Sequence, residues 1–166
     1  MAFGDHFQRG FPFVLGLIIF FSIIQLAISA WLTSRFNARH DYFNISERDR
    51  TRFILFASIW TTVLSSCYLL LFFTSQSSVL SSVLSLMIFL VLTWIFWTAG
   101  AASITASLGG GLNCSNTVFV YCGQLNAMEA FAWILWILTT FLLIVVAIRG
   151  ILSARRGDGF RGQLFA

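Results

Sequence analysis

The sequence predicts an all-α fold, an integral membrane bundle of four antiparallel helices. The chain is 58% hydrophobic and only 10% charged, whereas about 25% of the residues of an ordinary soluble domain are charged. Four stretches stay apolar for about 20 residues, the length that crosses the hydrocarbon core of a bilayer as a helix. Because a backbone inside lipid must satisfy its own hydrogen bonds, each stretch is expected to be helical.

The four spans are expected within a single membrane domain, residues 13–149. An N-terminal tail, residues 1–12, precedes this domain, and a basic tail, residues 150–166, follows it. The chain shows no second domain, no internal repeat and no heptad pattern. The expected spans cover residues 13–33, 53–73, 79–107 and 127–148.

The segments between the spans differ in character. The first, Ser34–Arg52, is polar and contains five arginines. The second, Thr74–Ser78, is so short that it predicts a tight hairpin between neighbouring spans. The third, Gly109–Asn126, contains no charged residue.

The loops, rather than the arginine count, indicate the orientation in the membrane. Five arginines fall on the side of the termini and five on the side of the first loop, so the positive-inside rule gives no answer. Cys114 and Cys122 are eight residues apart in the third loop, a spacing that a disulfide can close, and disulfides persist in oxidising compartments. Asn44 and Asn113 begin glycan acceptor triplets in the first and third loops. Together these features predict cytosolic termini.

Glu129 is the one ionisable residue inside an expected span, which makes it a candidate for a role in transport. Asn126 lies three residues before it, in the capping-box pattern of a helix N-terminus, and a carboxylate in the first turn suits the helix dipole. We therefore interpret Asn126 and Glu129 as the cap of the fourth helix. A transporter carboxylate is expected nearer to the bilayer centre.

Other residues inside the spans point to helix packing. Gln25 is strongly polar, and its amide is expected to hydrogen-bond to a neighbouring helix. Small residues recur every four positions on the second and third spans, which predicts faces where helices approach closely. The sequence leaves open whether these rows face the bundle interior or a second copy. The rows are Ala57, Thr61 and Ser65, then Ala99, Ser103 and Ser107, with Gly100 beside the second row.

The charge pattern argues against nucleic-acid binding, because the arginines cluster at the ends of apolar segments and form no basic face. The tail arginines, Arg149, Arg155, Arg156 and Arg161, are instead expected to contact anionic lipid. No cluster of His, Cys, Asp and Glu predicts a metal site, and no nucleophile beside a base predicts a catalytic site. The sequence therefore predicts no enzyme activity and no cofactor.

The third-span stretch Trp94–Ala101, the fourth-span run Ala127–Trp133 and the pair Cys114 and Cys122 resemble the MARVEL-domain families of tetraspan membrane proteins. The local match is best in the fungal branch, which includes the non-classical export protein family of eisosome-associated proteins. The strongly charged first loop departs from that pattern. The resemblance implies a role in lateral membrane compartments, membrane apposition or vesicle traffic, with the plasma membrane as the expected location.

We therefore expect a non-enzymatic protein that organises membranes through contacts with lipids, with copies of itself or with other membrane proteins. Sterol and sphingolipid are the candidate lipids at the deep tryptophans Trp94 and Trp97. The alternatives are a small transporter or channel and an accessory subunit of a larger complex. A conduction pathway should line several spans with polar side chains, and beyond Gln25 the spans contain only scattered serines and threonines.

Overall fold

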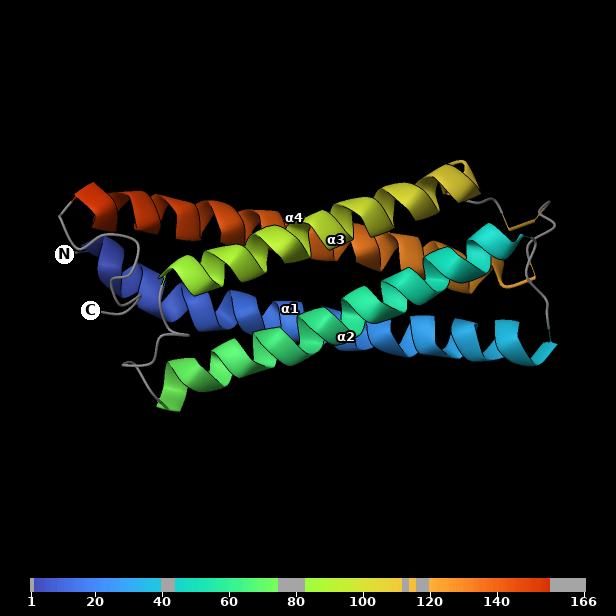
Figure 1. The fold of residues 1–166 in the computed structure, drawn as a ribbon, viewed down its shortest axis with the longest axis horizontal. Coiled ribbons are helices and arrows are strands. Elements are labelled where there is room, and N and C mark those ends of the chain that lie inside the picture. The colour runs from blue at the N-terminus through green and yellow to red at the C-terminus, as the bar shows by residue number, and fades with distance from the viewer. Residues whose placement is uncertain (1, 40–43, 75–82, 112–113, 116–119, 156–166) are drawn as a thin grey trace.

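The computed structural model contains four long α-helices that lie side by side (Figure 1). They are α1 (Ala2–Arg39), α2 (Ile45–Thr74), α3 (Val83–Leu108) and α4 (Cys122–Arg155). The structure describes residues 2–39, 44–74, 83–111, 114–115 and 120–155. All of the predicted hairpin Thr74–Ser78 except Thr74 itself lies outside these ranges.

Each of these helices is long and apolar enough to cross a membrane. The spanning parts are Gly10–Arg39, Ile45–Thr74, Leu84–Leu108 and Cys122–Leu152. A helix closes its own backbone hydrogen bonds, which is why four such elements can lie in lipid. The predicted fold class, an all-α membrane bundle of four helices, is therefore confirmed.

The helices alternate in direction around a closed ring. Helices α1 and α3 run one way along the bundle, and α2 and α4 run back (Figure 1). Each helix packs against the next in the chain, and α4 packs against α1. The end of the bundle where α1 begins and α4 ends is called the terminal end below. The opposite end, where α2 and α4 begin, is called the loop end.

Helices α1 and α2 extend well beyond the apolar stretches. Most of the polar segment Ser34–Arg52 is helical, because both helices continue into it. The carbonyl oxygen of Asn44 accepts hydrogen bonds from the backbone N–H groups of Glu47 at 3.0 Å and Arg48 at 3.5 Å, so Asn44 starts α2. Hydropathy marks where lipid ends, whereas a helix continues until its terminal backbone groups are capped.

The buried positions follow a seven-residue rhythm that the sequence does not reveal. On α1 they recur at alternating intervals of four and three residues, the spacing of a coiled-coil seam. The sequence shows no heptad because the seven-residue pattern lies in burial and not in hydrophobicity. Because lipid tails are as apolar as a protein core, outward faces carry the same hydrophobicity as inward ones. The α1 series is Phe11, Leu15, Ile18, Ser22, Gln25, Ser29, Leu32 and Phe36.

Small hydroxyl residues lie inside the bundle among apolar core residues, and large apolar residues also cover its outside. Phe13 and Phe20 of α1 are 68% and 58% exposed, and Leu70 of α2 is 63% exposed. A water-soluble bundle would carry polar residues on that outer surface, whereas buried hydroxyl groups are expected where helices associate by close packing and interhelical hydrogen bonds. The buried hydroxyl residues include Ser22, Ser29, Thr51, Ser58, Thr61, Ser65, Thr93 and Thr139.

Two glycines end α3 at the loop end. Gly109 and Gly110 have φ angles of 72° and 95°, in the left-handed region that glycine adopts without strain. The N–H of Gly110 donates to the carbonyl oxygen of Thr105 at 3.1 Å, which satisfies one of the last carbonyl groups of the helix. The chain can therefore leave α3 abruptly for the third loop.

Helix α4 begins earlier than predicted. Its first residue is Cys122, and the carbonyl oxygen of Tyr121 accepts a hydrogen bond from the N–H of Leu125 at 3.0 Å. The prediction that Asn126 and Glu129 cap this helix is therefore wrong, because both residues lie within it. The first turns of a helix at the membrane surface need no apolar sequence, so hydropathy places the start too late.

Candidate functional site

Five of the six tryptophans join neighbouring helices by donating an indole N–H to a threonine hydroxyl. These five bonds connect α2 to α3 and α3 to α4, which makes α3 the centre of the network. An indole N–H inside a membrane has no water to bond, so a hydroxyl acceptor on the next helix satisfies it. The bonds are Trp60 to Thr93 (3.1 Å), Trp97 to Thr61 (3.0 Å), Trp94 to Thr140 (2.9 Å), Trp136 to Thr98 (2.8 Å) and Trp133 to Thr105 (3.0 Å).

The bonds between α3 and α4 include a reciprocal pair. Trp94 and Thr98 are four residues apart on α3, and Trp136 and Thr140 are four residues apart on α4. Because the two helices are antiparallel, each tryptophan meets the threonine of the other helix. The centroids of the two indole rings are 6.4 Å apart. The same short pattern on two helices therefore builds a two-fold contact.

Threonine suits this acceptor role for a chemical reason. Thr61 and Thr98 each donate their own hydroxyl hydrogen to the carbonyl four residues earlier in the same helix, both at 2.8 Å. Thr93 and Thr140 do the same, both at 2.7 Å. A hydroxyl that donates in this way keeps lone pairs to accept an indole N–H. Each of these threonines therefore satisfies its own helix and the neighbouring one together.

Gln25 joins α1 to α4 in the fully buried interior. Its Nε2 donates to the carbonyl oxygen of Met128 at 2.9 Å. Its Oε1 has no hydrogen-bond partner in the part of the chain that the structure describes. An unpaired buried acceptor costs about 1–3 kcal/mol. Three residues earlier on α1, the hydroxyl oxygens of Ser22 and Thr62 lie 2.9 Å apart and connect α1 to α2.

Glu129 belongs to a contact between α3 and α4. It is only 8% exposed, and its Oε1 accepts a hydrogen bond from the hydroxyl of Thr105 at 2.8 Å. The same hydroxyl accepts the indole N–H of Trp133. The carboxylate therefore ends a short chain of hydrogen bonds near the loop end of the bundle.

The small-residue row on α2 faces the bundle interior. Ala57, Thr61 and Ser65 are each 1% exposed. Thr61 is the acceptor of Trp97, whereas the hydroxyl of Ser65 has no hydrogen-bond partner among the described residues. For this row the open choice between the interior and a second copy is thus decided for the interior.

The row on α3 is placed differently. Ala99 is exposed, and Ser103 and Ser107 are partly buried. Gly100 beside them is buried where α2 passes close, and a Cβ atom there would lie 3.5 Å from Cγ1 of Ile54. Gly100 therefore marks the close approach of α2 and α3, and Ala99 faces outward.

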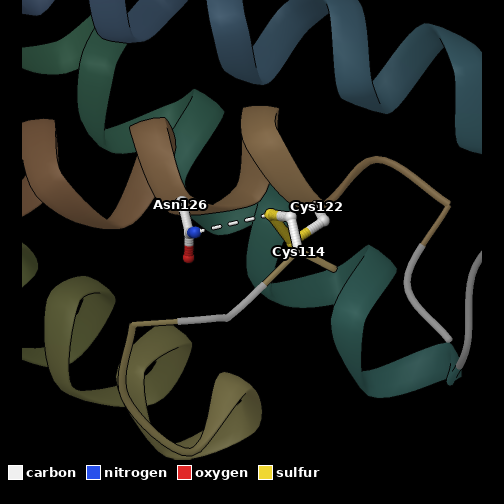
Figure 2. Close-up of a disulfide and its surroundings, with 3 residues drawn as sticks. All are labelled: Cys114, Cys122 and Asn126. Atoms are coloured by element: carbon white, nitrogen blue, oxygen red, sulfur yellow. Dashed lines mark hydrogen bonds between the residues drawn. A yellow bond between two sulfur atoms is a disulfide. The ribbon is translucent and has the colours of Figure 1, made fainter. Parts of the chain in front are cut away.

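A disulfide fixes the start of α4 at the loop end. It links Cys114 in the third loop to Cys122, with Cα atoms 5.7 Å apart. Asn126, one turn further along α4, points its amide toward the bridge, and its Nδ2 donates to Sγ of Cys114 at 3.7 Å (Figure 2). Tyr121, next to the bridge, packs its ring against Trp31 of α1 with centroids 5.2 Å apart. The third loop is thereby anchored to two helices.

The residues predicted to carry glycans or to contact anionic lipid are found near helix ends where the structure describes them. Asn44 is exposed at the start of α2, and Arg149 is partly buried near the end of α4. Arg155 is the last residue of α4. Their contacts with glycans or lipids stay predictions. Asn113, Arg156 and Arg161 lie outside the described residues.

The sequence alone did not predict that threonines accept the indole hydrogen bonds. The signal was present, since Thr93 precedes Trp94 and Thr98 follows Trp97. It could not be read without knowing which helices are neighbours. Within the described ranges, no group of three or more His, Cys, Asp or Glu residues is placed to hold a metal ion.

Comparison with known proteins gives one family match. The sequence matches the MARVEL domain, a membrane-associating domain, over residues 3–145. The match includes all of α2 and α3 and most of α1 and α4. Neither the curated proteins nor the solved structures give a significant match. The family match and the four spanning helices agree, and the chain belongs to the MARVEL family of tetraspan membrane proteins.

Proposed function

We propose that the protein organises its membrane laterally, without catalysing a reaction, through contacts with lipids and with copies of itself. The observation that carries the proposal is the division between the inside and the outside of the bundle. Most described polar side chains of the interior bond to their own or to neighbouring helices, as the bonds from Trp97 to Thr61 and from Trp94 to Thr140 illustrate. The outward faces of all four helices carry exposed large apolar side chains, among them Phe20, Phe56, Ile95 and Phe141.

An apolar outer surface on four tightly joined helices offers lipids and other spans a rigid, aromatic-rich wall. The resemblance to the fungal export and eisosome-associated branch favours lateral compartments over other membrane-organising roles. Sterol or sphingolipid contact with this wall, and self-association through it, belong to the proposal. The family description as a membrane-associating domain supports its membrane part.

The proposed location is the plasma membrane, with both termini in the cytosol. The disulfide between Cys114 and Cys122 lies at the loop end, and disulfides persist on the oxidising side of a membrane. Asn44, the start of a glycan acceptor triplet, is exposed at the same end. Both features support an outside loop end and therefore cytosolic termini.

Energy transfer between copies in giant vesicles tests the proposal. Full-length protein labelled with donor or acceptor dyes is reconstituted at low density into bilayers with coexisting lipid phases. We expect transfer above the value for randomly distributed proteins of the same density, and enrichment in one phase. A labelled lipid at matched density provides the random baseline. A random distribution in both phases would overturn the proposal.

A small transporter or channel is a second candidate, favoured by two specific features. Glu129 is a nearly buried carboxylate inside a span, and Gln25 carries an unpaired acceptor oxygen among the described residues. Intramembrane groups of this kind often belong to ion or proton pathways. Solute flux into sealed vesicles that is lost on Glu129→Gln would support this candidate. Co-purification of a different chain at fixed stoichiometry would instead indicate an accessory subunit.

A further inference from the structure

The arginines at the loop end differ in how the protein itself pairs them. On α2, Arg48 Nε lies 3.3 Å and Arg52 Nη1 lies 3.9 Å from the same carboxylate oxygen, Oδ1 of Asp49. Arg50 Nη1 donates to the carbonyl oxygen of Ser103 on α3 at 2.8 Å. All three arginines of α2 therefore contact oxygen atoms of the chain.

The two arginines of α1 at the loop end are not paired in this way. Arg35 and Arg39 are four residues apart and so lie on one face of the helix, where like charges destabilise each other. Neither forms an ion pair with a carboxylate among the described residues. The negative end of the helix dipole favours positive charge here but supplies no ligand to the outer N–H groups. Among the described residues, no carboxylate binds their planar donor groups, which suit an anion from outside the chain.

Trp31 extends the face of these two arginines toward the bilayer core. It precedes Arg35 by four residues, and the guanidinium carbon of Arg35 lies 5.2 Å from the centroid of its ring. The ring is 38% exposed, and the ring of Tyr121 packs against it in a T-shaped contact. Along α1 the order from the span outward is therefore an exposed indole, then two guanidinium groups. Lipids present the same order, with apolar and glycerol parts first and then the phosphate.

We propose that Arg35 and Arg39 bind the phosphate of a lipid whose headgroup carries a phosphate and a net negative charge, in the leaflet at the loop end. Guanidinium groups match phosphate oxygens in bidentate geometry, which favours a headgroup phosphate as the anion. Trp31 lies against the glycerol region of the same lipid. The site is distinct from Arg149 and Arg155, which lie near the end of α4, at the opposite end of the bundle. This site adds a lipid class to the proposed function. It depends on that proposed function only in requiring that the chain is inserted in a bilayer.

Native mass spectrometry of the full chain in mild detergent tests this site. The parent carries Arg155→Gln, Arg156→Gln and Arg161→Gln, so that three of the four tail arginines cannot supply the binding. Arg149 is present in the parent and in every variant, so it does not affect their comparison. Phosphatidylglycerol and phosphatidylcholine with identical acyl chains are titrated in turn. We expect tighter binding of phosphatidylglycerol, weakened about fivefold by Arg35→Gln and by Arg39→Gln. Arg52→Gln is the matched control, because the Arg52 guanidinium already bonds to Asn37 Oδ1 at 2.7 Å.

Three results would overturn the proposal. One is phosphatidylglycerol binding by the Arg35→Gln, Arg39→Gln double variant that equals binding by the parent. Another is equal weakening by Arg52→Gln, which would indicate net charge rather than a site. The third is equally tight binding of soluble glycerol phosphate, which would indicate a site for free phosphate. Circular dichroism shows whether each variant folds. The double variant Arg35→Lys, Arg39→Lys keeps the charge but loses the bidentate geometry, so we expect it to bind phosphatidylglycerol with intermediate strength. Loss of this site with lateral clustering unchanged would leave the proposed function standing.

Discussion

The indole N–H of Trp97 on α3 donates to the hydroxyl of Thr61 on α2 across 3.0 Å, and both side chains are almost completely buried. Trp97 is fully buried, so it is not placed for the sterol or sphingolipid contact that the sequence suggested at the deep tryptophans. Thr61 was expected only as a small residue in a packing row. One bond therefore turns two separate sequence features into a single contact that orients α3 against α2.

A double-mutant cycle measures the strength of this contact. Trp97→Phe removes the donor and Thr61→Val removes the acceptor. We expect a coupling of about 0.6–1.7 kcal/mol in the free energy of unfolding, the range of interhelical hydrogen bonds in membranes. Detergent-induced unfolding, followed by circular dichroism, provides the values. Thr74→Val is the matched control, because its exposed hydroxyl bonds only to Leu70 of its own helix. A coupling of zero would contradict a stabilising role for the pair.

Gly100 sets how closely α2 and α3 approach. A Cβ atom there meets Ile54 Cγ1 at 3.5 Å, an ordinary van der Waals distance, so Gly100→Ala should fit. Because alanine favours a helix over glycine, we expect unchanged or higher stability, by up to about 1 kcal/mol. Gly100→Leu should overpack the contact and lower the free energy of unfolding by about 1–3 kcal/mol. The exposed position Ala102 provides the comparison, since Ala102→Leu should have little effect. Equal effects of leucine at both positions would argue against the close approach.

The disulfide predicts a simple thiol count. Cys114 and Cys122 are paired, and Cys67 is a free cysteine on the outside of α2. Denatured protein treated with a maleimide that carries a large polymer should therefore be modified at one cysteine before reduction and at three cysteines after it. The number of modified cysteines is read from the shift in gel mobility. Three additions before reduction would show that the bridge does not form in the cell. Closing so short a loop is worth about 2–3 kcal/mol, so Cys114→Ser should destabilise the fold by a similar amount.

The proposed orientation predicts which end a membrane-impermeant maleimide reaches in intact cells. In a Cys67→Ala background, Asn44→Cys should react without permeabilisation, because position 44 is exposed at the loop end. Gly159→Cys in the tail should react only after permeabilisation. Each variant has one free thiol, because Cys114 and Cys122 are paired, and the two variants control for each other. The reverse pattern of labelling would invert the orientation.

The fold class follows from hydropathy because the bilayer imposes helices on every long apolar stretch. The disulfide partners are also predictable from the sequence, since loop spacing is a local pattern. The small-residue row of Ala57, Thr61 and Ser65 is a local pattern as well, but whether it faces the interior or a second copy was decided only by the structure. Helix ends are harder to predict from the sequence. The cap at Asn126 was misplaced because hydropathy reports the edge of the lipid rather than the start of α4 at Cys122.

The interior was the least predictable part. In water an inward face is recognised because it is more apolar than the outward one. Here Gln25, Ser22 and Ser29 are fully buried while Phe20 is exposed, so hydrophobicity alone carries no direction. The threonine that accepts each indole is fixed only by the pairing of antiparallel helices, as Trp94 with Thr140 illustrates. Such partners require the tertiary arrangement.

In the proposed function, the outer surface of the bundle contacts lipids and other copies in the plane of the membrane, while the interior polar groups hold the helices together. Energy transfer between labelled copies and solute flux, measured in the same reconstituted vesicles, test this claim together. We expect energy transfer above the random baseline, and the same background solute flux for the native chain and for Glu129→Gln. A random distribution of copies, combined with flux that disappears on Glu129→Gln, would contradict it.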